Sequence, residues 1–157
     1  MANVRVAFEE FEGDKIQLPP GYQEVGCHMI FDVRMGKNFR RKARMVAGGH
    51  TNETPAALTY ASLVSRDSVS IALTIAALKN LKVLPCDIQN AYLTAKCREK
   101  IWTIAGPEFG SDVGKLMIVV RALCGLKSSG AAFRALLSET VYDLGYTPSK
   151  ADPDVWL

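Results

Sequence analysis

The amino-acid sequence predicts an α+β fold, because candidate strands and helices are mixed along the chain without strict β-α-β alternation. Its 157 residues are enough for one domain with a hydrophobic core, or for part of a larger one. The hydrophobic fraction of 48% and the charged fraction of 22% are typical of a globular protein. The longest apolar run, "IALTIAAL" at 71–78, is too short to span a bilayer, so no membrane partner is expected.

Charge is distributed unevenly along the chain. Residues 1–17 are acidic and weakly patterned, which predicts a loose, solvated lead-in. Residues 34–44 hold six Lys and Arg side chains and no acid. The net charge of +3 does not by itself indicate a nucleic-acid-binding protein, but such a local cluster attracts phosphates whatever the total.

The four cysteines are widely spaced, with no C-x-x-C pair and no histidine at zinc-finger spacing. No apolar signal segment stands at the N-terminus. Reduced thiols in a cytosolic or nuclear protein that is not secreted are therefore expected.

The N-terminal half predicts a hairpin and a helix. "LPPGYQEV" at 18–25 is a turn, and residues 27–35 and 39–47 read as two strands around Gly36-Lys37-Asn38. Alternation along the second strand gives one basic face, formed by Arg40, Lys42 and Arg44. After a long connection at 48–65, Ser65 or Asp67 can cap a helix to about Asn80, whose apolar residues run nearly all round and predict burial.

The C-terminal half predicts strands at 81–88, 98–105 and 115–123, the first of them in the core. Ser128 or Ser129 then starts a helix that presents one apolar face and ends at Gly145. "ADPDVWL" at 151–157 has the pattern of the start of another strand.

Asp87 is the first candidate functional residue, since it ends the apolar run "KVLPCDI". An acid at the end of a buried strand is costly unless a donor or cation meets it. Two readings stay open for this residue: a carboxylate satisfied by backbone N–H groups or a Lys or Arg, and a ligand of a hard cation such as Mg²⁺. Tyr92 is similarly either a core residue or a ring beside whatever Asp87 binds.

"ALCGLKSSGAAF" at 122–133 is the second candidate. Gly125 permits a close backbone approach, Lys127 supplies a cation, and the serines open a helix whose N-terminus favours anions. The spacing is not that of a Walker loop, and a well-capped β-turn-α connection explains it equally well.

Five motifs stand in a particular order: "RRKARMVAGGH", "LPCDIQNAYL", "KIWTIAGPEFG", "ALCGLKSSGAAF" and "ADPDVWL". In this order they resemble the reverse transcriptase domain of copia-type (Pseudoviridae) LTR retrotransposon Pol polyproteins, from about Leu18 to Leu157. The resemblance implies the fingers (about 18–80) and a partial palm (about 81–157) of a right-handed polymerase. Such an RNA-directed DNA polymerase adds deoxynucleotides to a primer 3′ end by two-Mg²⁺ phosphoryl transfer.

The resemblance also implies roles for individual residues. Asp87 would be the first of three catalytic, metal-binding carboxylates, and Tyr92, next to Ala91, would lie beneath the incoming sugar and exclude a 2′-hydroxyl. Lys42 and Arg44 would contact the triphosphate, and Gly125 and Lys127 would line the nucleotide and template side. Arg40 and Arg41 would belong to a basic groove that holds template-primer through its phosphates.

The sequence departs from the family pattern at several positions. The family usually has Lys where this chain has Gly48, and an aromatic residue where it has Cys124. It usually has Pro in place of Gly130 and Trp in place of Phe133. More important, the Tyr-x-Asp-Asp motif with the other two carboxylates is absent, and its place would be beyond Leu157. We therefore expect no polymerase activity from this polypeptide alone, and Mg²⁺ (or Mn²⁺) binding only together with that segment.

The expected partners are an RNA or DNA template-primer, dNTP and the remainder of the Pol polyprotein, in a cytoplasmic virus-like particle or the nucleus. Two alternatives remain. A non-catalytic relic of a retrotransposon would bind nucleic acid through the basic hairpin without needing Mg²⁺ or Asp87. A structural module that merely shares the pattern would bind none.

Overall fold

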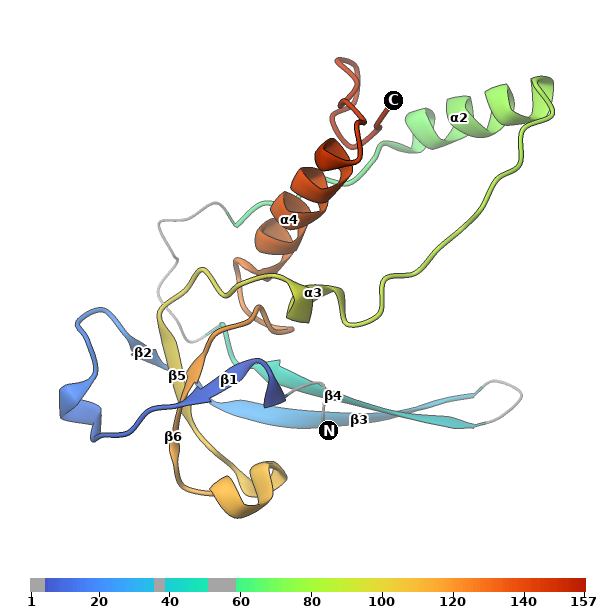
Figure 1. Cartoon of the computed structure of the whole chain (residues 1–157). Coiled ribbons are helices and arrows are strands. Elements are labelled where there is room, and N and C mark those ends of the chain that lie inside the picture. The colour runs from blue at the N-terminus through green and yellow to red at the C-terminus, as the bar shows by residue number, and fades with distance from the viewer. Residues whose placement is uncertain (1–4, 36–38, 51–58) are drawn as a thin grey trace.

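The computed structural model describes residues 5–35, 39–50 and 59–157, and it has the mixed α+β content that the sequence predicts (Figure 1). One sheet has the strand order β1-β6-β5-β2, formed by Phe8–Glu10, Leu116–Val119, Ile101–Ile104 and Gln23–Glu24. β6 runs antiparallel to both β1 and β5, whereas β2 is parallel to β5, so the sheet is mixed. Strands β5 and β6 confirm the prediction for these two segments.

The second sheet is the predicted hairpin of β3 (Cys27–Arg34) and β4 (Arg40–Ala47). Its antiparallel register runs without interruption from Cys27 opposite Ala47 to Arg34 opposite Arg40. The Gly36-Lys37-Asn38 turn lies outside the described residues. Near the body of the molecule, Met45 and Ala47 are buried on one face of β4.

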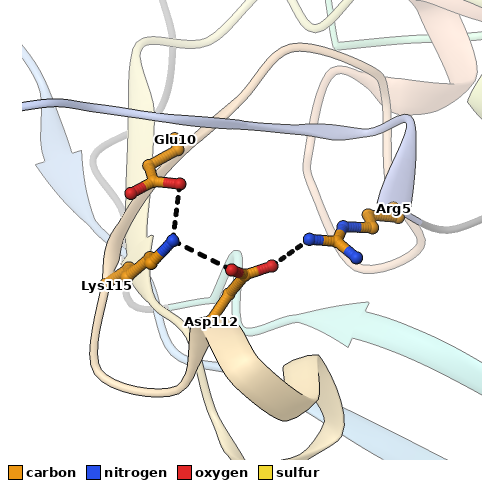
Figure 2. A network of polar contacts seen from close by, with 4 residues as sticks. All are labelled: Arg5, Glu10, Asp112 and Lys115. Carbon is orange, nitrogen blue, oxygen red and sulfur yellow. Dashed lines mark hydrogen bonds and ion pairs between the residues drawn. The ribbon is translucent and has the colours of Figure 1, made fainter.

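The acidic N-terminal segment is not the loose lead-in that the sequence predicts, because Phe8–Glu10 form an edge strand of the mixed sheet. Phe8 is buried and meets the ring of Phe109 edge-on at 5.0 Å. Figure 2 shows the ion pairs that fasten this strand: Lys115 Nζ lies 2.8 Å from Glu10 Oε2 and 3.0 Å from Asp112 Oδ1. Arg5 also pairs with Asp112, and the prediction failed because these partners lie about a hundred residues away in sequence.

Helix α2 (Arg66–Leu78) begins at the predicted cap, where Ser65 Oγ accepts a hydrogen bond from the backbone N–H of Ser68. The prediction that it is buried is wrong, since none of its residues is buried and Ile71 is 60% exposed. In Figure 1 it projects away from both sheets. Apolar side chains favour burial, but they do not supply the surface that covers them.

The predicted core strand at 81–88 is also wrong. These residues form no strand, and all of them are exposed. A strand needs a neighbour for its backbone hydrogen bonds, and no strand of the described chain pairs with this segment. It runs instead as an extended connection from α2 to the short helix α3 (Ala91–Thr94) (Figure 1).

Helix α4 (Ser129–Asp143) confirms the prediction for its start and for its end before Gly145. Only the N-terminal part of its apolar face is covered, where Phe133 and Leu136 pack on the small buried cluster of Ala95, Ala122 and Ala132. The main core lies around the mixed sheet and the base of the hairpin, with Val25, Ile101 and Leu123 nearly inaccessible. The helices of the described residues include none with the length and apolar character needed to cross a membrane.

The C-terminal segment is not a strand as predicted, but a loop closed by an isolated bridge between Pro148 and Trp156. Its Asp152 accepts hydrogen bonds from the Ser65 backbone N–H (2.9 Å) and the Ser68 hydroxyl (2.6 Å). Asp154 pairs with Arg134 of α4 at 2.8 Å. The "ADPD" motif therefore joins the start of α2 to α4. Two short 3₁₀ helices, η1 (Lys15–Gln17) and η2 (Pro107–Asp112), lie between β1 and β2 and between β5 and β6.

Candidate functional site

A cavity of about 520 Å³ lies between the β3–β4 hairpin and the segment that precedes α3. Strand β4 contributes Arg41, Lys42 and Ala43, and the segment contributes Asp87, Ile88, Gln89 and Asn90. The fold therefore places the basic strand opposite Asp87, although the two motifs are far apart in sequence.

A second cavity, of about 380 Å³, shares Ala43 and Asn90 with the first and so adjoins it. Its lining includes Arg44 of β4, Ala91 and Tyr92 of α3, and Cys124 of the turn before α4. Together the linings of the two adjoining cavities draw on three of the five sequence motifs.

Asp87 differs from its predicted setting, because it does not end a buried strand. Its side chain is exposed, so the carboxylate can remain hydrated and no buried charge has to be compensated. Asp87 is nevertheless the one acidic residue among the described residues that line the two cavities. The described lining of the site therefore combines one carboxylate with the cations of Arg41, Lys42 and Arg44.

The residues present do not make a two-metal centre by themselves. Among residues 5–35, 39–50 and 59–157, no group of three or more His, Cys, Asp or Glu side chains is arranged to hold a metal ion. A pair of divalent cations held by protein oxygens needs several carboxylates. Asp87 alone supplies one.

Tyr92 lies at the junction of the second cavity and α4. Asn90, in the left-handed region at φ 52°, turns the chain into α3, so that Tyr92 faces the ring of Phe133 edge-on at 6.3 Å. Tyr92 is 37% exposed and is therefore not the fully buried core residue of the simpler reading. A half-exposed ring held on one edge can present its other side to a ligand.

The turn before α4 packs tightly against β4. The backbone N–H of Ala47 donates to the carbonyl of Cys124 at 2.8 Å. Gly125 has φ +95°, and a Cβ at this position would lie 2.0 Å from the carbonyl oxygen of Ala47. The predicted close approach at Gly125 is thus present, and the group it approaches is the backbone of the basic strand.

At the start of α4, where the sequence predicts that the serine pair favours an anion, a carboxylate of the chain itself binds Ser128. The carboxylate of Glu99 accepts hydrogen bonds from the backbone N–H of Ser128 at 2.9 Å and from its hydroxyl at 2.6 Å. Sequence reasoning missed Glu99, because it lies 29 residues before Ser128 and no local pattern links them.

Of the predicted site residues, one lies outside the described lining of the cavities, and one has a side chain that the structure does not describe. Lys127 is half-buried and is not among the described lining residues. Arg40 belongs to β4, but its side chain lies outside what the structure describes. Arg41, Lys42, Arg44, Asp87, Ala91 and Tyr92 line one or other cavity, and Gly125 adjoins them through β4.

Two of the four cysteines, Cys27 and Cys97, are partly buried, and their thiols ionise less readily than an ordinary thiol. Burial raises the pKa of Cys27 to about 11, despite a hydrogen bond from Thr103 that opposes the shift. Burial likewise raises the pKa of Cys97. Cys86, one residue before Asp87, is exposed, and all four thiols are free.

Comparison with known proteins identifies the family. The chain is 28% identical over 148 residues to the retrovirus-related Pol polyprotein from transposon RE2 of Arabidopsis thaliana, and 28% over 153 residues to that from transposon RE1. The matches cover 88% and 92% of this chain but 10% of each relative, and no solved structure matches significantly. The model of the reverse transcriptase (RNA-dependent DNA polymerase) family matches residues 13–157, nearly the whole chain. The chain therefore belongs to the reverse transcriptase family.

Proposed function

We propose that this chain forms the nucleotide-binding side of an RNA-directed DNA polymerase. The observation that carries the proposal is the pair of adjoining cavities, in which the basic strand β4 faces Asp87 and Tyr92. In the proposed division, about residues 18–80 are fingers and about 81–157 are part of the palm. The hairpin carries the cations of the fingers, and α3 carries the motif that follows Asp87.

The proposed nucleotide lies across both cavities. Lys42 and Arg44 contact its phosphates, because they line the site from the same strand. Tyr92 and Ala91 lie beneath the sugar, where the ring leaves no room for a 2′-hydroxyl and so favours deoxynucleotides. Gly125 and Lys127 flank the template side, and Arg40 and Arg41 hold the template-primer through backbone phosphates.

Reverse transcriptases generally use divalent metal ions, and Asp87 is the ligand that this chain would contribute to an Mg²⁺ or Mn²⁺ site. The two remaining carboxylates, in a Tyr-x-Asp-Asp motif, are not in these residues. Bound metal ions would lower the barrier to phosphoryl transfer. Since one carboxylate does not hold them, this polypeptide binds template-primer but does not extend it.

The test separates binding from catalysis. Fluorescence anisotropy of a labelled RNA–DNA primer duplex measures binding by the 157-residue chain, and primer extension with Mg²⁺ and dNTP measures activity. We expect binding without extension, and extension from a longer polyprotein segment that includes Tyr-x-Asp-Asp, abolished by Asp87→Asn. Absence of duplex binding at low salt would overturn the proposal and would favour a structural module.

A second candidate is a nucleic-acid-binding relic without catalysis, favoured by the exposed basic strand beside a single carboxylate. It predicts that no segment of the polyprotein extends a primer, and that binding is indifferent to Mg²⁺ and to Asp87→Asn. The retrotransposon relatives suggest the remainder of a Pol polyprotein as partner and a cytoplasmic virus-like particle or the nucleus as location.

A further inference from the structure

Glu99 lies just before β5, at a point where the backbone is well anchored. Two residues later Ile101 is only 1% exposed, and β5 is paired on both edges, with β2 and β6. The backbone N–H of Cys97 donates to the carbonyl of Val120 at 2.9 Å. The carboxylate of Glu99 therefore extends from a fixed part of the mixed sheet.

The partner of Glu99 is the last turn residue before α4. Ser128 is 1% exposed, and both its N–H and its hydroxyl donate to the same oxygen, Glu99 Oε1. Ser129, 2% exposed, donates its hydroxyl to the carbonyl of Leu123 at 2.7 Å, which closes the turn on itself. A buried donor without an acceptor lowers the stability of the folded state. The carboxylate of Glu99 therefore stabilises this turn.

The turn that Glu99 holds is also the wall of the proposed nucleotide site. Leu123 and Cys124 line the second cavity, and Gly125 contacts β4 at Ala47. A Cβ on Gly49, just after β4, would lie 2.3 Å from the carbonyl oxygen of Gly125, so the turn and the strand fit with no free space. A shift of the turn would displace β4 and its cations.

We infer that Glu99 is a positioning residue: its carboxylate fills the anion position at the start of α4 and locks the 123–128 turn against the basic strand. One consequence concerns substrate orientation, and it rests on the proposed function. Because Glu99 places a negative charge at the start of α4, where it accepts from the N–H and the hydroxyl of Ser128, the phosphates of a nucleotide contact Lys42 and Arg44 of β4 and not the start of α4.

Amide hydrogen exchange of the free 157-residue chain tests the positioning role. Removing the acceptor in Glu99→Ala is expected to speed exchange at the Ser128 amide and its neighbours in the turn by about tenfold or more. Glu99→Gln keeps an acceptor oxygen without the charge. Its exchange rate at the Ser128 amide should therefore lie between those of wild type and Glu99→Ala. Glu139→Ala, on an exposed position of α4, is the matched control and should leave the turn unchanged.

Rescue by an added anion distinguishes positioning from a general loss of stability. Sodium acetate should enter the space left in Glu99→Ala and restore protection of the turn, whereas sodium chloride of equal ionic strength should not. If turn exchange in Glu99→Ala equals that of wild type, the inference is wrong. It is also wrong if Glu99→Ala unfolds and Glu99→Gln shows wild-type exchange.

Binding of the labelled primer duplex adds the functional readout. Glu99→Ala should weaken binding severalfold, and acetate should recover it in parallel with exchange protection. A wild-type chain that binds no duplex would refute the proposed function, while the exchange measurement would still decide the role of Glu99.

Discussion

Gly125 has a conformation and an environment that together exclude every side chain. Its φ of +95° is disfavoured for residues with a Cβ, and the space where that Cβ would lie is filled by the backbone of β4. The sequence predicts a close backbone approach at this residue. The structure adds that the approach joins two motifs of the candidate site.

We expect Gly125→Ala to lower the free energy of unfolding by about 2 kcal/mol or more, because backbone strain and a clash act together. The matched control is Gly114→Ala, where φ is +84° but no atom lies within 4 Å of the added Cβ. Strain alone should then cost about 1 kcal/mol. Urea denaturation of the two variants measures both values, and equal destabilisation would contradict the role of the contact with Ala47.

Thiol reactivity should distinguish partly buried Cys27 from exposed Cys86. Raising the pKa of Cys27 from 9.0 to about 11 lowers its thiolate fraction near pH 8 by about a hundredfold, before any hindrance from burial. Because the less acidic thiolate is also the stronger nucleophile, iodoacetamide should label exposed Cys86 at least about tenfold faster than Cys27. Peptide mass spectrometry measures both rates in one sample, and comparable rates would show that Cys27 is not buried as described.

At the scale of elements, α2 is held mainly at its first turn. Asp152 receives the Ser68 hydroxyl and the Ser65 backbone N–H, and these hydrogen bonds lower its pKa from 3.8 to about 2. The remainder of the helix is exposed apolar surface. The "ADPD" motif thus has a structural reading in this chain, as the attachment point of α2 to the C-terminal loop.

Asp152→Asn should loosen this attachment, with severalfold faster hydrogen exchange in the first turn of α2 and no change for Asp143→Asn at the exposed end of α4. The pH dependence has a defined sign. Folding lowers the pKa of Asp152. The stabilisation from its carboxylate is therefore fully present above pH 3.8 and disappears as the pH falls through about 2. The difference in urea midpoint between wild type and Asp152→Asn should shrink over that window, and a constant difference would exclude this linkage.

At the scale of the whole molecule, a net charge of only +3 hides a strongly basic hairpin. Binding of template-primer should therefore weaken steeply with salt, since released counterions drive the association. We expect Arg41→Ala to weaken binding and to flatten the slope of log K against log salt concentration by about 1. Lys79→Ala, at the exposed end of α2, should leave the slope unchanged in the same anisotropy titration. Equal slopes for all three proteins would place the duplex elsewhere.

Local pattern was enough to predict the elements whose cause is local. The β3–β4 hairpin, the Ser65 cap and the span of α4 depend on neighbouring residues: alternation, a capping oxygen and a helix that stops before glycine. The five motifs also indicated the reverse transcriptase family, which the family match confirms. Those motifs named six residues that do line the cavities.

Tertiary structure decided everything that depends on a distant partner. Phe8–Glu10 became a strand because β6 pairs with it and Lys115 forms an ion pair with Glu10, and residues 81–88 stayed unpaired because no described strand adjoins them. Apolar character reports a preference for burial, whereas burial itself requires a covering surface, as α2 shows. Glu99 reaches the start of α4 only because the sheet places β5 beside it. Its separation from Ser128 along the chain does not predict this contact.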